Sequence, residues 1–157
     1  MKQRELIILS MLRENARQTL TRMSRKSNIP VSTLYDHLKQ QEQKLILKHT
    51  VLLDFGKLGF STRAKIALKV RPDDREAVKD FLVAAHCLNS VMKINNGFDF
   101  LIEGIFRDMK EMEDFLEQLD QKFKVSAKQI YFIIDDLKKE AFLSNAKLIP
   151  LLFPESA

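Results

Sequence analysis

The stretch Thr-Leu-Thr-Arg-Met-Ser-Arg-Lys-Ser-Asn-Ile-Pro-Val-Ser-Thr-Leu-Tyr-Asp-His-Leu, residues 19–38, decides the fold of the N-terminal part of the chain. Thr19 is suited to cap a short helix, and Asn28 tolerates the left-handed conformation in which helices commonly end. Pro30 disfavours helical geometry in the residue before it, so this helix must stop there. A further helix is expected to open between Pro30 and Ser32, directly after a tight turn.

A preceding helix is predicted from about residue 4 to residue 14. Its apolar stripe is formed by Leu6, Leu9 and Leu12, widened by Ile8 and Met11. In the third helix, Val31, Leu34 and Leu38 share the face expected to be buried. Three short helices within about forty residues, with a tight turn between the last two, are typical of a helix-turn-helix or winged-helix-like domain. The alternative is a small helical bundle without a DNA-binding role.

The polar side chains of the third helix favour DNA recognition over that alternative. Hydroxyl, carboxylate, imidazole and ammonium groups fill its remaining faces and can reach base edges in a major groove. The residues predicted to contact bases are Ser32, Thr33, Tyr35, Asp36, His37 and Lys39. Those predicted to contact phosphates are Arg17, Arg22, Arg25 and Lys26.

The charge distribution points the same way. Residues 1–50 hold 10 Lys and Arg against 4 Asp and Glu, a net charge of +6, whereas residues 51–157 hold 16 basic and 17 acidic groups, a net of −1. A basic module joined to a neutral one is expected when one end of a protein meets a polyanion. A basic surface that only maintains solubility is the alternative.

The remainder of the chain alternates between strand and helix patterns. Residues 45–53 are rich in strand formers, and a turn follows at 54–59. Strands are predicted at 63–70, 90–94, 98–106 and 127–137, and helices at about 73–87 and 108–123, with a hairpin turn at 95–97. The order β-α-β-β-α-β is that of a ferredoxin-like domain, so the fold class is α+β.

The predicted sheet carries more apolar residues than one covered face requires, which suggests that its second face is buried against another copy of the chain. The apolar residues concerned are Ile66, Leu68, Phe100, Ile102, Phe132 and Ile134. A dimer is therefore expected.

These patterns divide the chain into four parts: a helix-turn-helix domain at 1–44, a linker strand and turn at 45–60, a ferredoxin-like domain at 61–138 and a C-terminal extension at 139–157. The extension is apolar but too short and interrupted to span a membrane, so it should pack on the ferredoxin-like domain or on a neighbouring subunit. With no signal peptide or membrane segment in view, a cytoplasmic protein without a membrane partner is expected.

No catalytic constellation stands out. The single cysteine, Cys87, excludes an internal disulfide or a multi-cysteine zinc site and is best explained as a small core residue. Adjacent helical residues point in different directions, so His86 is not placed to act as its base. There is no glycine-rich phosphate loop, and neither a cofactor nor a metal is expected. An enzyme built on the ferredoxin-like domain would need a polar cluster that the sequence does not offer.

Residues 5–138 resemble the Lrp/AsnC family of leucine-responsive, or feast/famine, regulators. Four segments carry the resemblance: Ile8–Arg17 with its Asn-Ala-Arg ending, Ser32–Leu34 at the start of the recognition helix, the linker signature Thr50–Asp54 with Lys57–Phe60, and Asn96–Asp99 where the family has Gly-Asp-Tyr-Asp. The chain departs from the family at Asp36, where an Arg is usual, and in that hairpin, where Asn96 replaces Gly and Gly97 replaces the first acid.

The resemblance implies a sequence-specific, DNA-binding transcription regulator that forms dimers, or octamers, through its C-terminal sensor domain. It also implies that an amino acid or similar small molecule binds as an effector near the sensor hairpin. By position, the effector-binding residues are Asn95, Asn96, Gly97, Phe98 and Asp99. The departures motivate a second hypothesis, a ligand-binding or assembly-modulating protein that binds DNA weakly or only together with a related regulator.

Overall fold

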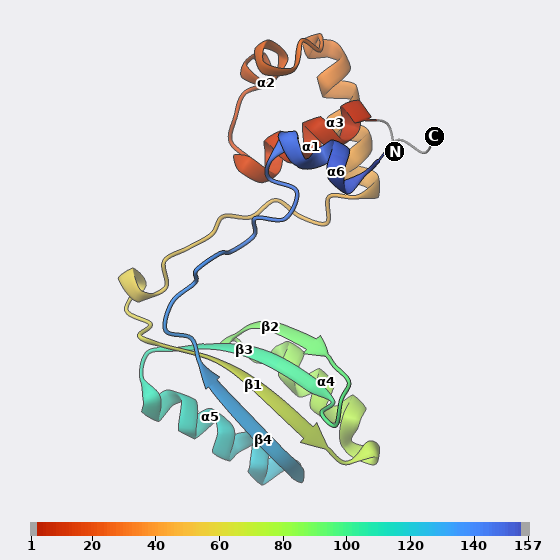
Figure 1. Ribbon diagram of the computed structural model, residues 1–157. Helices are drawn as coiled ribbons and strands as arrows, with labels where there is room; N and C mark the ends of the chain where they lie inside the picture. Colours follow the sequence, from red (N-terminus) through yellow and green to blue (C-terminus); the bar gives the residue numbers. More distant parts are fainter. Residues whose placement is uncertain (1–2, 155–157) are drawn as a thin grey trace. The chain divides into compact units, whose positions relative to one another are not determined.

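The computed structural model describes residues 3–154, which fall into two compact units (Figure 1). One unit, called here the helix-turn-helix unit, combines the chain up to Val51 with the chain from Leu137 onward. The other, the sheet unit, is the continuous stretch Leu52–Asp136. Residues 1–2 and 155–157, which the sequence assigned to the first domain and to the extension, lie outside the described residues.

The first three helices follow the expected helix-turn-helix plan. They are α1 at Gln3–Glu14, α2 at Leu20–Ser27 and α3 at Val31–Lys44. The Thr19 hydroxyl caps α2 by accepting a hydrogen bond from the backbone N–H of Arg22 at 3.2 Å. Asn28 ends the same helix with φ 55°, and its N–H donates to the Ser24 carbonyl at 2.9 Å. Both sequence predictions for the turn are therefore confirmed.

A small apolar core joins these three helices. Its buried members are Ile8, Met11, Met23, Ile29 and Leu34. The expectation that Val31 shares this core is wrong, because its side chain is 43% exposed. The buried face of α3 is centred on Leu34 and Gln41, seven residues apart, and Val31 in the first turn is rotated away from that line.

Residues 45–53 form no strand, so the predicted linker strand is wrong. A strand exists only through its hydrogen-bonded ladder, and no other strand of the described chain lies beside this segment. Its apolar side chains are correspondingly open, with Leu47 99% and Val51 66% exposed. The predicted turn that follows is present as a 3-10 turn, Gly56–Leu58, which ends at Gly59 with φ 90°.

The sheet unit has the predicted β-α-β-β-α-β order. Its strands are β1 at Thr62–Val70, β2 at Leu88–Lys93, β3 at Phe100–Phe106 and β4 at Val125–Phe132. They form one antiparallel sheet in the order β2-β3-β1-β4. Its helices are α4 at Arg75–Ala84, after the 3-10 turn Pro72–Asp74, and α5 at Met109–Lys122. A single core joins α4 and α5 to one face of the sheet, which is the ferredoxin-like arrangement.

Two element boundaries in this unit differ from the sequence prediction. Helix α4 ends at Ala84, three residues before Cys87, because Ala85 turns to an extended conformation with ψ 117° and β2 already begins at Leu88. Strand β4 does not continue to residue 137. Its last bond to β1 runs from the N–H of Ile133 to the Arg63 carbonyl, and β1 begins only one residue earlier, so nothing remains to pair with.

The apolar residues expected on the second face of the sheet lie elsewhere. Ile66, Leu68, Phe100 and Ile102 all belong to the core beneath the helices, and Ile134 lies beyond the end of β4. Phe132 lies opposite Ala64, which belongs to the same core face, so these six side chains do not form the apolar second face from which a dimer was expected. Register alternation places a different set, of mixed polarity, on the face away from the helices. That set includes Lys65, Ala67, Met92, Leu101, Glu103 and Tyr131.

The C-terminal segment forms a 3-10 turn, Ala146–Leu148, and the short helix α6, Ile149–Leu152. Both contact α1, so the segment packs on the helix-turn-helix unit. The expectation that it would pack on the ferredoxin-like domain is wrong. Its anchor is Ile149, which is 1% exposed. Among the described residues, no helix has both the length and the apolar character needed to cross a membrane.

Candidate nucleic-acid interface

An exposed polar face runs along α3. Ser32, Tyr35, Asp36 and Lys39 follow the spacing i, i+3, i+4, i+7, which aligns them on one side of a helix. All four are exposed, and Tyr35 keeps 54% of its surface open. The structure thus brings four of the six predicted base-contacting residues onto one continuous surface. Such a surface offers hydroxyl, carboxylate and ammonium groups to a partner.

The other two predicted base-contacting residues, Thr33 and His37, lie on the flank of this face and are half-buried. The His37 ring is directed toward α1, where Nδ1 lies 4.0 Å from the Glu5 carboxylate. Only 24% of the His37 side chain is exposed. His37 is therefore packed between α3 and α1, where its Nδ1 forms no hydrogen bond within the described part of the chain.

Val31 joins the exposed face, a position that the sequence analysis had assigned to the core. It stands one helical turn before Tyr35, and its methyl groups are open to solvent. The signal that could have identified it is the i, i+4 relation to Tyr35 together with its place directly after Pro30. An exposed aliphatic group on a recognition helix is suited to contact a thymine methyl.

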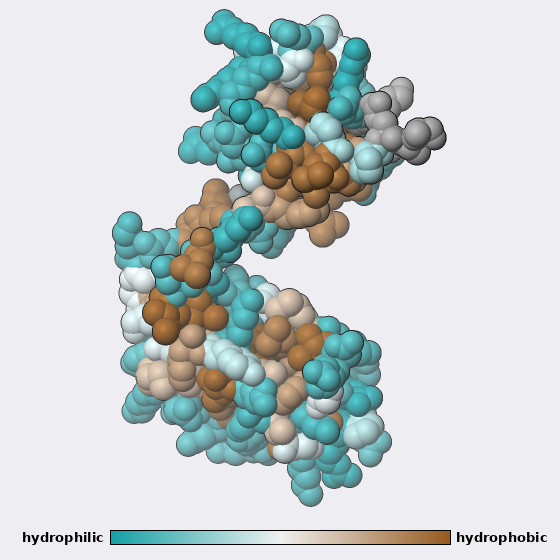
Figure 2. All heavy atoms as spheres, viewed as in Figure 1, coloured by the Kyte–Doolittle hydropathy of each residue, from teal (hydrophilic) through white to brown (hydrophobic). Residues whose placement is uncertain are grey.

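Basic side chains lie on α2 and in the turn that precedes it. Arg17, Arg22 and Arg25 are all exposed, and none has an acidic partner within ion-pair distance among the described residues. Lys26 lies 3.6 Å from the Glu14 carboxylate at the end of α1. In Figure 2 the surface around α2 is strongly hydrophilic. Three of the four predicted phosphate-contacting residues therefore carry charge that no acidic side chain within residues 3–154 neutralises.

The predicted effector hairpin is a tight turn between β2 and β3. Asn96 and Gly97 occupy its two central positions with φ 64° and 88°, the pattern of a type I′ turn. Asn95, Asn96 and Gly97 are exposed, whereas Phe98 and Asp99 are half-buried.

Asp99 is already committed within the sheet unit. Its carboxylate accepts a hydrogen bond from the N–H of Val70 at 2.9 Å and pairs with Arg75 at 2.8 Å. These contacts fix the hairpin against the end of β1 and the start of α4. The amide side chains of Asn95 and Asn96 are the polar groups of the hairpin that stay open to a ligand.

Two shallow hollows lie at the opposite end of β2, near Cys87 and His86. Their volumes are about 440 and 490 Å³, and both are lined mainly by apolar side chains. Burial raises the pKa of the Cys87 thiol, which makes it a poor nucleophile and agrees with a packing role. Within residues 3–154, no group of three or more His, Cys, Asp and Glu side chains is placed to hold a metal.

Proteins with similar sequences are known, although their identity to this chain is low. No family model matches the chain. An "uncharacterized HTH-type transcriptional regulator" of Pyrococcus furiosus is 25% identical over 113 residues, 71% of this chain and 76% of that protein. The "HTH-type transcriptional regulator FL11" of Pyrococcus abyssi is 23% identical over 111 residues, 70% of this chain and 74% of that protein.

Solved structures agree over a larger part of the chain. A transcriptional regulator from Neisseria meningitidis, solved in complex with L-Met, superimposes with a TM-score of 0.81 at 22% identity, covering 88% of this chain and 93% of that one. LrpC of B. subtilis gives 0.79 at 17% identity over 88% and 97%. AsnC of E. coli gives 0.78 at 13% identity over 88% and 95%. The chain has the Lrp/AsnC fold.

The sequence relatives of this chain are named as transcriptional regulators of the helix-turn-helix type, and the structure contains that motif. The chain is therefore similar to regulators of this type in sequence and in fold. Its exposed α3 face and surrounding arginines are the parts of the structure that suit this role.

Proposed function

We propose that the chain binds duplex DNA by placing the exposed face of α3 in a major groove. The observation that carries this proposal is the continuous polar face of Ser32, Tyr35, Asp36 and Lys39 on the second helix of a helix-turn-helix. Val31 at its start supplies an apolar contact for a thymine methyl, and Asp36 can accept a hydrogen bond from a cytosine amino group. Thr33 contacts bases from the flank, while His37 positions the helix against α1.

The basic residues of α2 and its flanks would supply most of the affinity. Arg17, Arg22 and Arg25 are unpaired cations within the described unit, and Lys26 has only a weak partner in Glu14. Phosphate contacts of this kind release counterions, so binding should weaken steeply as salt is added. They orient the protein but carry no sequence information.

The regulator would act as a dimer or as an octamer built through its sheet unit. The face of the sheet away from α4 and α5 is of mixed polarity and includes half-buried apolar residues such as Leu101 and Ile105. Two-fold pairing on this face would present two α3 helices to a dyad-symmetric site whose half-sites lie one helical turn, or a multiple, apart.

An amino acid or a similar small molecule is the proposed effector. The Neisseria meningitidis regulator of the same fold was solved with L-Met. In this chain, Asn95 and Asn96 would contact the ligand from the exposed turn, with Gly97 leaving room for it and Phe98 supplying an apolar edge. Asp99 would act through its contact with Arg75. Titration of L-Met and other amino acids into wild type and Asn95→Ala, followed by thermal shift, tests this assignment.

Genome-wide mapping of bound sites, followed by footprinting on one such site, tests DNA binding. Tyr35→Ala and Thr33→Ala should each change base preference at one or two positions of a half-site. Arg22→Ala should weaken binding to all sequences about equally and reduce the salt slope by about one. Arg71→Ala, which removes an exposed arginine from the sheet unit, is the matched control and should leave binding unchanged.

A different outcome would support the second hypothesis. If the purified protein produces no footprint but associates tightly with a related regulator, the chain modulates assembly and does not recognise DNA by itself. If Tyr35→Ala and Thr33→Ala both bind with unchanged base preference, α3 does not recognise the sequence.

A further inference from the structure

Helix α1 is buried on two opposite sides. Ile8 and Met11 point into the core shared with α2 and α3. Leu6 and Ser10, one turn apart on the other side, are 2% and 1% exposed, yet neither belongs to that core. Because the 3-10 turn Ala146–Leu148 and α6 contact α1, the C-terminal segment is what covers this second side. The anchor on that segment is Ile149, which is itself 1% exposed.

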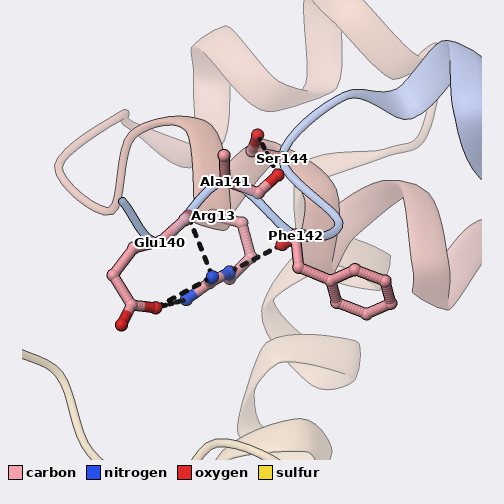
Figure 3. A network of polar contacts seen from close by, with 5 residues as sticks. All are labelled: Arg13, Glu140, Ala141, Phe142 and Ser144. Carbon is pink, nitrogen blue, oxygen red and sulfur yellow. Dashed lines mark hydrogen bonds and ion pairs between the residues drawn. The ribbon is translucent and has the colours of Figure 1, made fainter. Parts of the chain in front are cut away.

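A polar clasp closes the same side of α1 at its C-terminal end. Arg13 lies two turns after Leu6, on the same line of the helix. Its guanidinium donates to the Glu140 carboxylate at 3.0 Å, to the Glu140 carbonyl at 2.9 Å and to the Phe142 carbonyl at 3.1 Å (Figure 3). One side chain thus holds three acceptors, which fixes geometry more strictly than a single ion pair does.

The acceptors of the clasp are held by a compact turn. Glu140 and Leu143 have φ of 49° and 59°, a conformation that non-glycine residues seldom adopt. The Ser144 hydroxyl donates to the Ala141 carbonyl at 2.8 Å, within the same turn. Figure 3 shows the Phe142 ring directed away from Arg13, so only its backbone takes part. A turn of this shape is specified by contacts and is not a random trailing end.

Helix α1 in turn contacts the recognition helix. Glu5, next to Leu6, lies beside the His37 ring on α3 at 4.0 Å. A chain of contacts therefore runs from Ile149 through α1 to α3. The C-terminal segment lies at one end of this chain and the exposed face of Ser32, Tyr35, Asp36 and Lys39 at the other.

We propose that residues 137–154 are an integral part of the DNA-binding unit, in which Arg13, Glu140 and Ile149 are positioning residues that set α3 through α1. The sheet unit is then an insertion within the DNA-binding unit and not a domain appended to it. The part of the inference that concerns DNA affinity rests on the proposed function. The part that concerns α1 does not.

The insertion has a geometric consequence within the sheet unit. The start of β1 lies beside the end of β4, since the N–H of Ile133 donates to the Arg63 carbonyl at 2.9 Å. Arg63 also pairs with Asp136, the last residue of the unit, at 2.5 Å.

The test uses the full-length protein carrying Ile149→Asp, which places a charge in the buried contact with α1. Amide hydrogen exchange reports on α1 without any need for DNA, and fluorescence anisotropy on a mapped site reports on binding. We expect exchange in α1 to accelerate about tenfold or more and DNA affinity to fall by a similar factor. Leu151→Asp is the matched control, because Leu151 is 78% exposed on the same helix. It should change neither quantity.

Two milder variants keep the inference testable if Ile149→Asp does not fold. Ile149→Ala should show the same two effects to a smaller degree. Arg13→Lys preserves the charge available to DNA, but one ammonium nitrogen cannot reach the three separate positions at which Nε, Nη1 and Nη2 of Arg13 donate. It should therefore accelerate exchange in α1 and weaken binding severalfold with an unchanged salt slope.

Unchanged α1 exchange in the Ile149 variants would overturn the inference. Faster exchange with wild-type DNA affinity would refute the positioning role and leave only a stabilising contact. If wild type itself binds no mapped site, the proposed function fails, whereas the exchange measurement still decides whether the segment belongs to the unit.

Discussion

The two units of this protein differ in the size of their hydrophobic cores and in how their sequence is arranged along the chain. Among the described residues, the sheet unit gathers thirteen buried apolar residues in one core, whereas the three-helix core of the other unit has five. The sheet unit is continuous in sequence, and the helix-turn-helix unit takes material from both ends of the chain. Because the chain up to Val51 is too short to bury much surface by itself, the C-terminal segment supplies cover that the three helices lack.

The two units also differ in how well their buried polar side chains are hydrogen-bonded. In the sheet unit, the Glu103 carboxylate is 6% exposed and accepts hydrogen bonds from Arg63 and Asn89, each at 2.7 Å. In the helix-turn-helix unit, the side-chain oxygens of Gln18 and Gln41 are buried without a hydrogen-bond partner among the described residues. Satisfied buried groups stabilise a fold and orphaned ones do not, so the sheet unit should be the more stable of the two.

The largest effect is expected from Leu68→Ala, which opens a cavity in the centre of the sheet-unit core. Burial of this leucine is complete, and such truncations cost about 2–5 kcal/mol. NMR-monitored urea unfolding, resolved for each unit, should show the loss in the sheet unit alone. Ile134→Ala is the control, because Ile134 is 99% exposed. A parallel loss in the helix-turn-helix unit would mean that the two units unfold together.

A smaller loss is expected when Arg63 is replaced by Met. Asp136 and Glu103 both bond its guanidinium, and these contacts raise the pKa of Arg63 above its usual range. Removing it leaves the Glu103 carboxylate buried without its cation, which should cost roughly 3 kcal/mol. The same unfolding experiment measures it, with Arg71→Met as the exposed control. A loss as small as that of the control would show that water replaces the guanidinium.

Low pH should weaken the hydrogen-bond network of Glu103, Arg63 and Asn89 and so lower the stability of the sheet unit. Burial by itself raises the pKa of Glu103, but the hydrogen bonds from Asn89 and Arg63 outweigh it, so the pKa lies below its ordinary value. A lowered pKa gives stability that is complete above the unfolded value, about 4.3, and is lost as pH falls through the folded value. Between about pH 5 and 2, the sheet unit of wild type should therefore lose more stability than that of Glu103→Gln. Equal slopes would contradict the assignment.

The sequence predicted the elements of both units well wherever a local rule fixed them. Thr19, Asn28 and the Asn96-Gly97 turn were identified because caps and tight turns depend on neighbouring residues only. The failures needed knowledge of distant partners. Local sequence does not show that residues 45–53 have no strand to pair with. It also does not show that Ile149, more than a hundred residues after α1, lies in the helix that packs on it.

The candidate site shows the same division. The polar face of α3 follows from helical spacing, so most of its members could be named from sequence. Val31 was predicted in the core but is exposed, and His37 was predicted on the base-contacting face but is half-buried toward α1. Both depend on how α3 packs on α1, which local sequence does not determine. In the effector hairpin, Asp99 looked free for a ligand, but its partners, Arg75 and Val70, come from α4 and β1.

The smallest expected effect is the difference in stability loss when the N-cap residue of one helix is removed in each unit. Asp108 caps α5 by accepting from the N–H of Glu111 at 2.8 Å, and the Glu111 carboxylate returns to the N–H of Arg107, so this helix start is held from both sides. Thr19 caps α2 alone at 3.2 Å. Asp108→Ala should cost about 1–2 kcal/mol and Thr19→Ala about 0.5–1 kcal/mol, because the carboxylate also interacts favourably with the helix dipole.

Unit-resolved unfolding of both variants measures the difference. A larger loss for Thr19→Ala would mean that the helix-turn-helix unit depends on its local cap more than on the C-terminal segment, which would reverse the comparison between the two units.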